Sequence, residues 1–173
     1  MKRRRLLAAL AGTGLAGASL WAAQNGIPGV DTEAALPRRV ETLSAAGSEA
    51  GEATVPTPDT VTLVDLFATW CDPCDEQIEI LGAIRPDYDD VSFVSVTNER
   101  PSETLTRAEI ADWWDRNGGR WTVGIDPGSD LLTAFGADGL PYVAIADTDG
   151  TISYRQSGLA GESELREQLD RLV

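Results

Sequence analysis

Two cysteines three residues apart are the side chains of this chain best suited to chemistry. Cys71 and Cys74 are its only cysteines, and Asp72 and Pro73 lie between them. A disulfide that closes so short a ring constrains the unfolded chain very little, which disfavours a purely structural role. The Cys-x-x-Cys pair therefore predicts a redox-active dithiol that alternates with a disulfide.

The position of the pair between a buried strand and a helix explains how one sulfur becomes reactive. Residues 61–67 form a short, mostly apolar run typical of a strand buried on both faces, and residues 71–84 follow with helical spacing. The first N–H groups of a helix lack intrahelical partners and carry positive potential, so a Cys71 thiolate is expected to be stabilised there. Cys74, one turn further on, is the predicted resolving thiol. Pro73 is tolerated because its missing N–H would have no partner in the first turn.

A two-step exchange follows from this arrangement. Cys71 attacks a partner disulfide and forms a mixed disulfide, and Cys74 then attacks Cys71 and releases the reduced partner. Asp65 lies on the apolar run six residues before Cys71, where burial would raise its pKa and suit it to accept the proton of Cys74. The alternative is an Asp65 that faces solvent, and the apolar neighbours Val64 and Leu66 do not decide between the two.

Acidic residues around the motif oppose a negative charge on Cys71. Asp72 adjoins Cys71, and Asp75, Glu76 and Glu79 follow on the predicted helix. Like charges disfavour the thiolate, so we expect Cys71 to be less acidic than in strongly oxidising dithiol proteins, which favours a reducing role. The same residues could instead form disulfides, because direction depends on the reduction potential relative to the compartment.

The rest of the chain alternates strand and helix patterns and ends in a hairpin. Strands are predicted at residues 91–96, 121–125, 142–146 and 151–155, and helices at residues 105–116, 129–135 and 162–172. This order predicts an α/β fold with a mixed central β-sheet and helices on both faces. Residues 40–43 and 53–55 are weaker candidates for two paired strands.

Two segments carry a resemblance to a known family. Val64-Asp65-Leu66-Phe67-Ala68-Thr69-Trp70-Cys71-Asp72-Pro73-Cys74 closely resembles the active-site strand and motif of the thioredoxin superfamily, most of all its exported, membrane-tethered TlpA-like branch. Gly139-Leu140-Pro141-Tyr142 lies before a predicted strand, where that superfamily has a cis-proline facing the cysteines. The resemblance, over about residues 60–173, implies a thioredoxin-like three-layer fold. It also implies a cis Pro141 and a substrate strand that pairs with the Leu140 backbone.

Other residues near the motif are expected to bind substrate or to depart from the family pattern. Trp70 is predicted to form an exposed apolar docking surface with Leu140 and Tyr142. By contrast, the three remaining tryptophans of the predicted domain are expected to pack in the core (Trp113, Trp114 and Trp121). Gln77 stands where the TlpA-like branch often has Glu. Tyr142 replaces the usual Thr, and many TlpA-like members lack an acid at the position of Asp65.

The N-terminus has the pattern of an export signal. The basic residues 2–5 precede an uncharged stretch, residues 6–23, and the paired arginines resemble the twin-arginine export pattern. The stretch is weakly apolar, so a cleaved signal and a retained membrane anchor both stay open. We predict a signal or anchor at 1–25, a linker at 26–37 and a thioredoxin-like domain at 38–173 with its core at 60–173. This layout predicts an exported protein, either membrane-anchored or secreted.

The composition excludes several classes of function. The chain has 28 acidic and 14 basic residues, a net charge of −14, and so disfavours nucleic acid and anionic membrane surfaces. Its acidity indicates either a generally solubilising surface or a site for a basic partner. Because Lys2 is its only lysine, the chain resembles proteins of salt-loving archaea, and we predict a halophilic domain that needs salt. The absence of histidine excludes His-based triads and His-containing zinc sites.

The leading prediction is an extracytoplasmic thiol–disulfide oxidoreductase that reduces protein disulfides. It is expected to need no metal and no cofactor beyond the Cys71–Cys74 disulfide, and to draw electrons from a membrane or extracytoplasmic donor. Cell redox homeostasis and cytochrome c maturation are the roles that the TlpA-like resemblance implies. The alternative is a carrier of a soft metal such as copper(I), held between the two thiolates. No Met or His accompanies the pair, and a peroxidase is weaker still because no Thr or Arg constellation surrounds Cys71.

Overall fold

A computed structural model describes residues 36–173 of the chain. The predicted signal or anchor at 1–25, and the linker up to residue 35, lie outside the described residues. Within the described part, no helix combines the length and the hydrophobicity needed to cross a bilayer.

A seven-stranded mixed sheet forms the middle layer, with the strand order β2-β1-β5-β4-β3-β6-β7. The strands are β1 (Arg38–Thr42), β2 (Gly51–Val55), β3 (Thr62–Phe67), β4 (Ser92–Thr97), β5 (Thr122–Ile125), β6 (Tyr142–Ala146) and β7 (Ile152–Ser157). Strands β3, β4 and β5 run parallel, whereas β6 is antiparallel to both β3 and β7. The weakly indicated strands before the core pair as the antiparallel hairpin β1–β2, whose β1 extends the sheet next to β5.

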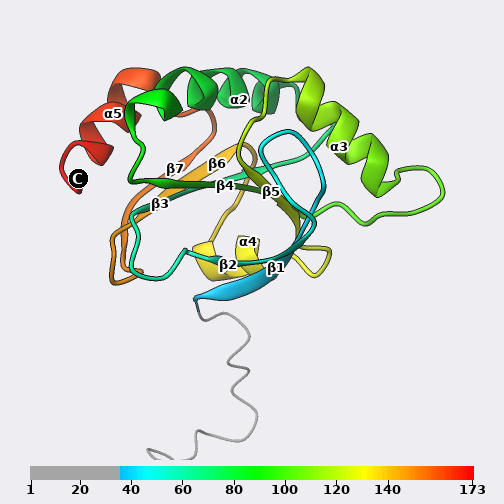
Figure 1. Ribbon diagram of the computed structural model, residues 1–173, viewed down its shortest axis with the longest axis horizontal. Coiled ribbons are helices and arrows are strands. Elements are labelled where there is room, and N and C mark those ends of the chain that lie inside the picture. The colour runs from blue at the N-terminus through cyan, green and yellow to red at the C-terminus, as the bar shows by residue number, and fades with distance from the viewer. Residues whose placement is uncertain (1–35) are drawn as a thin grey trace, which may run out of the picture. The chain divides into compact units, whose positions relative to one another are not determined.

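Helices cover both faces of this sheet (Figure 1). On one face lie α2 (Asp72–Ile84), α3 (Arg107–Arg116) and α5 (Glu162–Leu169), and on the other lies the short α4 (Asp130–Phe135). The predicted three-layer α/β fold is therefore confirmed. Helix α3 starts two residues later than predicted, because Thr106 and Glu109 form a capping box that sets its first turn.

The side chains of β3 divide between two hydrophobic cores. Leu63 and Phe67 pack in the layer that contains α2, α3 and α5, whereas Val64 and Leu66 pack against α4. Successive side chains of a strand point to opposite faces, so a strand inside the sheet must be apolar on both. All six residues of β3 are buried, and this strand delivers the chain to the cysteine motif.

The predicted packing role of the three tryptophans is confirmed. Trp114 and Trp121 are 0% and 3% exposed and meet edge to face, with ring centroids 4.9 Å apart. Trp113 stacks on Phe67 at 5.0 Å, with the two rings within 7° of parallel. This aromatic cluster packs α3 onto the sheet next to the end of β3.

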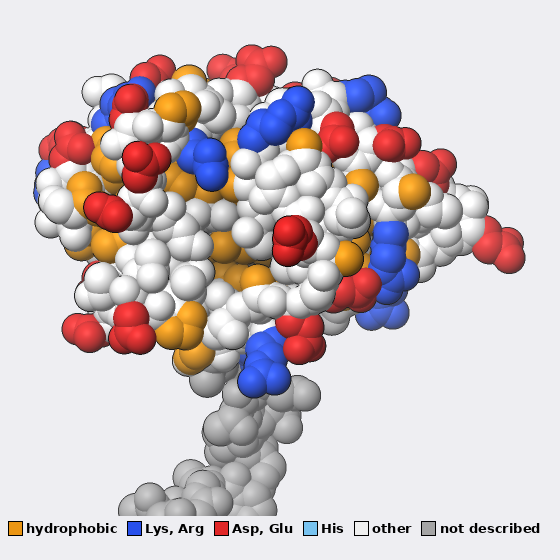
Figure 2. All heavy atoms as spheres, in the orientation of Figure 1, with side chains coloured by type: hydrophobic (Ala, Val, Ile, Leu, Met, Phe, Trp, Pro, Cys, Tyr) orange, Lys and Arg blue, Asp and Glu red, His pale blue; other side chains and the backbone are white. Residues whose placement is uncertain are grey.

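Charge of one sign does not gather into a single patch on the visible face. Figure 2 shows acidic side chains scattered over the described residues on this side, with basic groups between them. That distribution fits the interpretation of a generally acidic, solvated surface.

Candidate active site

Cys71 and Cys74 form a disulfide at the start of α2, with their Cα atoms 5.3 Å apart. Cys71 is the N-cap residue and keeps an extended backbone (φ −98°, ψ 95°), while Cys74 lies in the first helical turn. Cys71 is 5% exposed and Cys74 is 0% exposed. Of the two cysteines, only Cys71 therefore keeps any solvent-exposed surface.

The backbone around the motif limits how many donors a Cys71 thiolate can use. The N–H of Cys71 donates to Ala68 O (3.1 Å), and the N–H of Cys74 donates to Cys71 O (2.9 Å). Pro73 supplies no N–H in the first turn. The anionic groups nearby add to this effect: burial, followed by the charges of Asp72 and Glu79, raises the pKa of Asp75. A thiolate at Cys71 would therefore lie near negatively charged side chains and have few free N–H groups to accept hydrogen bonds from.

Asp65 is fully buried in the middle of β3 and faces the helix layer that holds the cysteines. Its direction follows from strand alternation with Leu63 and Phe67, so the solvent-facing alternative is wrong. Ser95 Oγ donates to Asp65 Oδ2 at 2.8 Å, and Trp121 Nε1 donates to Ser95 Oγ at 2.9 Å. The other oxygen, Oδ1, has no hydrogen-bond partner among the described residues.

The burial of Asp65 sets how its carboxyl group titrates. Loss of hydration raises the pKa of Asp65 to about 7, and the hydrogen bond from Ser95 opposes the shift. Such a group can take up or release a proton near neutral pH. It has the property expected of a proton acceptor for the resolving thiol.

The Leu140–Pro141 peptide bond is cis, as the resemblance implied. Pro141 directly precedes β6, whose first residue, Tyr142, pairs with Leu66 near the end of β3. The carbonyl oxygen of Pro141 accepts a hydrogen bond from the N–H of Gly158 (2.8 Å). The proline loop therefore lies beside the strand end from which the cysteine motif departs.

The exposed apolar surface differs in part from the prediction. Trp70 is 71% exposed, and Leu140 is partly buried. Tyr142 is not exposed: its side chain is 4% accessible, packs against the α4 core and donates its hydroxyl hydrogen to Phe135 O (2.8 Å). As the first residue of β6 it points to the face opposite the cysteines, so only its backbone is placed to meet a substrate there.

Leu159 is an exposed apolar residue that the sequence did not single out. It is 38% exposed and stands between two anchored neighbours. Gly158 bonds to Pro141, and the N–H of Ala160 donates to Gln77 Oε1 at 2.8 Å. These anchors hold Leu159 in the loop between β7 and α5, next to the proline loop.

Two further residues near the motif become visible only in the fold. Gln77, noted above as a departure, is fully buried and also donates from Nε2 to Ala160 O (3.3 Å), which ties α2 to the start of α5. Glu99, absent from the sequence predictions, accepts hydrogen bonds from Thr69 just before the motif. The sequence feature that could have pointed to Glu99 is its position just after β4. Neighbouring parallel strands bring their carboxyl ends to the same edge of a sheet, so a residue after β4 lies near the end of β3.

No cluster of three or more metal-ligating side chains occurs within residues 36–173. The two cysteines are joined to each other, and in that state they present no thiolate to a soft metal. The described site is therefore a disulfide flanked by a buried acid and a cis-proline loop.

Comparisons with known proteins agree with this site. A family model described as Redoxin matches residues 35–169. The thiol:disulfide interchange protein CycY of Rhizobium leguminosarum bv. viciae is 29% identical over 143 residues, which cover 82% of this chain and 69% of that protein. The thiol-disulfide oxidoreductase ResA of Bacillus thuringiensis is 20% identical over 110 residues, covering 64% of this chain and 62% of the relative. The match thus spans less than two thirds of ResA.

The fold is shared with solved structures. The structure of MTB dsbF, in its mixed oxidised and reduced forms, superposes with a TM-score of 0.67 at 18% identity and covers 81% of this chain and 98% of dsbF. At that level of identity the likeness concerns the fold.

Proposed function

Because this chain belongs to the Redoxin family and is a thiol–disulfide oxidoreductase, we propose that it works outside the cytoplasm as a protein-disulfide reductase. The observation that carries the proposal is the difference between the two cysteines at the helix start: Cys71 keeps 5% of its surface exposed, and Cys74 is fully buried. Their partners are proposed to be protein thiols and disulfides.

The reaction has two displacements. The Sγ thiolate of Cys71 attacks one sulfur of a partner disulfide, which forms a mixed disulfide and releases the other partner sulfur as a thiolate. The Cys74 thiolate then attacks Cys71 Sγ, the mixed disulfide breaks, and the partner leaves with both sulfurs reduced. Two electrons have moved from the protein dithiol to the partner, and Asp65 is the proposed acceptor of the Cys74 proton. A thiol donor outside the cytoplasm or in the membrane must then reduce the Cys71–Cys74 disulfide.

The partner is proposed to bind along the proline loop. The Leu140 backbone next to the cis bond is the proposed pairing edge for an extended substrate segment. Trp70 and Leu159 supply exposed apolar contacts beside it. Tyr142 contributes its backbone at this edge, because its side chain is buried on the other face.

The reducing direction is supported by the charges around the motif. A dithiol becomes a strong oxidant when its thiolate is stabilised, because that stabilises its reduced form. Here Asp72 and Asp75 lie in the first turn of α2, and Pro73 removes one donor. The thiolate is poorly stabilised, so the disulfide form is favoured and the dithiol gives up electrons readily.

The location outside the cytoplasm is supported by the N-terminal sequence and by the TlpA-like resemblance. The basic residues 2–5 and the uncharged residues 6–23 have the order of an export signal or anchor. A role in cytochrome c maturation is one that this resemblance implies. In intact cells, reduced Cys71 should react with a membrane-impermeant thiol reagent. Labelling that requires cell lysis would contradict the location.

The function is tested by trapping clients with a Cys74→Ser variant. Cys71 should then stay in mixed disulfides with client proteins, and the double variant with Cys71→Ser should trap none. In parallel, the wild-type protein supplied with dithiothreitol should reduce the disulfides of insulin. Absence of insulin reduction, combined with tight one-to-one binding of copper(I) by the reduced protein, would overturn the proposal in favour of the metal carrier.

A further inference from the structure

Glu99 ties together the two loops that leave the ends of β3 and β4. Its Oε2 accepts hydrogen bonds from the backbone N–H of Thr69 (2.8 Å) and from Thr97 Oγ (3.0 Å), and its Oε1 accepts one from Thr69 Oγ (2.7 Å). Thr97 is fully buried at the end of β4, and its Oγ also accepts the N–H of Glu99 at 3.2 Å. The carboxylate is thus fixed to the sheet at one end and holds Thr69 at the other.

The held segment is the turn that presents the active site. The N–H of Cys71 donates to Ala68 O at 3.1 Å, which closes a turn with Thr69 and Trp70 at its corners. Trp70 projects into solvent with 71% of its surface exposed and therefore packs little against the domain. Within residues 36–173, Glu99 is the one side chain that hydrogen-bonds to either corner residue.

The two cysteines differ in what holds them when the disulfide is open. Cys74 belongs to α2 and is fully buried, so the helix and the core fix its sulfur. Cys71 is the residue between the turn and the helix. In the dithiol or in a mixed disulfide it keeps its packing in the core and the hydrogen bond that its carbonyl oxygen accepts from the N–H of Cys74, but it loses the covalent restraint of the disulfide. At that stage the turn, and hence the bonds to Glu99, restrict where Cys71 can move.

We propose that Glu99 is a positioning residue for thiol–disulfide exchange, whose carboxylate holds the turn at residues 68–71 and so keeps Cys71 within reach of Cys74. This inference rests on the proposed exchange function. Charge-assisted hydrogen bonds to a carboxylate are among the stronger ones in proteins, and two of them here fall on a single residue, Thr69. A restrained pair of thiols has a higher effective concentration for each other, which favours the intramolecular disulfide.

The test measures the equilibrium between the protein and glutathione. One protein dithiol and one oxidised glutathione give one protein disulfide and two reduced glutathiones, so the constant reports the effective concentration of the two thiols. Glu99→Ala should lower this constant about tenfold, because the turn is released and the dithiol is less well ordered. That change makes the reduction potential about 30 mV less negative, at about 30 mV for each tenfold change of a two-electron couple.

Two further variants separate the hydrogen bonds from the charge. Glu99→Gln keeps one oxygen for the N–H of Thr69 and an NH₂ for its hydroxyl, and should stay within about twofold of the wild type. Thr69→Val keeps the shape and the backbone N–H but loses the hydroxyl donor, and should lower the constant about threefold. If Glu99→Ala fails to fold, the constant of Thr69→Val tests whether the bonds between Glu99 and Thr69 position Cys71.

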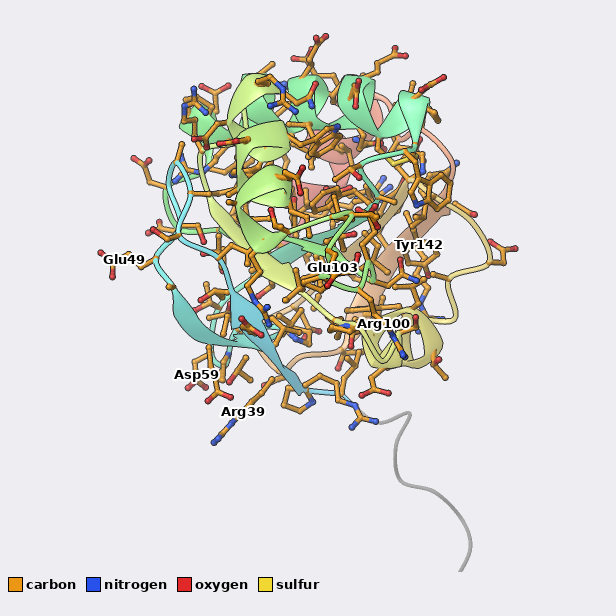
Figure 3. All side chains as sticks on the ribbon, turned by 90° about the vertical axis from the view of Figure 1, so that its right-hand side faces the viewer. Arg39, Glu49, Asp59, Arg100, Glu103 and Tyr142 are labelled. Carbon is orange, nitrogen blue, oxygen red and sulfur yellow. A yellow bond between two sulfur atoms is a disulfide. The ribbon has the colours of Figure 1, made fainter. Side chains whose placement is uncertain are left out.

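Glu103→Ala is the matched control for Glu99→Ala. Glu103 lies on the same connection between β4 and α3, is exposed and accepts no hydrogen bond from the described residues (Figure 3). Its removal deletes the same charge from that connection and should leave the constant within about twofold of the wild type. Folded Glu99→Ala and Thr69→Val proteins with the wild-type constant, or an equal shift in Glu103→Ala, would overturn the inference. A wild-type protein that does not exchange with glutathione would overturn the proposed function instead.

Discussion

Replacing the buried Asp65 by asparagine should stabilise the oxidised protein at pH 8 and give little or no gain in stability at pH 5. The carboxyl group lies between the sheet and the helix layer with one hydrogen bond, from Ser95, and with no partner for its second oxygen among the described residues. Ionisation in that position is costly, because the group is fully buried and no positive group of residues 36–173 contributes to its titration. Asparagine has nearly the same shape and carries no charge.

The magnitude follows from the difference between the folded and the unfolded pKa of Asp65. The unfolded carboxyl ionises near pH 3.8 and the folded one near pH 7, so the folded state holds the proton over the interval between them. The free energy of unfolding therefore falls as pH rises through that interval, by about 1.4 kcal/mol for each pH unit at most. The raised pKa of Asp65 therefore lowers the free energy of unfolding by between about 1 and 2 kcal/mol at pH 5 and by about 4 kcal/mol at pH 8.

The asparagine side chain introduces a cost of its own that does not depend on pH. Its carbonyl oxygen can accept the hydrogen bond of Ser95, but its NH₂ group then lies where Asp65 Oδ1 has no partner. A buried polar group without a partner costs about 1–3 kcal/mol. This cost is the same at both pH values. The free energy of unfolding of Asp65→Asn, relative to the wild type, should therefore rise by about 2–3 kcal/mol from pH 5 to pH 8.

The assay is urea unfolding of the oxidised proteins at both pH values, because the closed disulfide keeps the thiols from titrating. The control is Asp90→Asn, which changes an exposed carboxyl on the connection before β4 and should show no such pH dependence. If the difference between Asp65→Asn and the wild type were the same at pH 5 and pH 8, the carboxyl would not titrate near neutrality. The proposed role of Asp65 as acceptor of the Cys74 proton would then lose its physical basis.

Three further predictions concern packing, docking and salt. Gln77→Ala should lower the free energy of unfolding by about 2–4 kcal/mol, because both backbone groups of Ala160 lose their partner. Urea titration should show a loss below about 1 kcal/mol for the control Gln156→Ala, and an equally small loss for Gln77→Ala would contradict the reasoning. Trp70→Ala should leave stability within about 0.5 kcal/mol of the wild type but slow insulin reduction severalfold without changing the glutathione equilibrium. Unchanged insulin reduction would remove Trp70 from the docking surface. Finally, the free energy of unfolding should rise from dilute buffer to molar salt, because salt screens the repulsion among the acidic residues. Equal stability in the two buffers would refute the halophilic prediction.

Local spacing was enough to predict the reactive pair and the elements that carry it. Cys71 and Cys74 lie one helical turn apart, and a helix brings residues at that spacing together whatever the rest of the fold does. The apolar run of β3 likewise predicted a strand buried on both faces, and all six of its residues are buried. The motif and the strand also carry the family resemblance that implied the thioredoxin-like fold.

Orientation within the buried strands was decided only by the tertiary structure. A strand that is apolar on both faces lacks the alternation of polar and apolar residues, so its sequence does not indicate which face meets the cysteines. For this reason the sequence left the direction of Asp65 open, and it wrongly placed the side chain of Tyr142 on the exposed surface. In the fold, Asp65 faces the cysteine layer and Tyr142 faces α4, because each shares its face with the residues two positions away along its own strand.

The side-chain contacts that steady the site also required the fold. Glu99 holds Thr69 from 30 residues away, and Gln77 holds Ala160 across 83 residues. No local periodicity brings such pairs together, because their distance depends on which strands are neighbours and on how α5 packs back against α2. The sequence by itself thus determined the chemistry of the two sulfurs, and the strand order decided which side chains hold them in place.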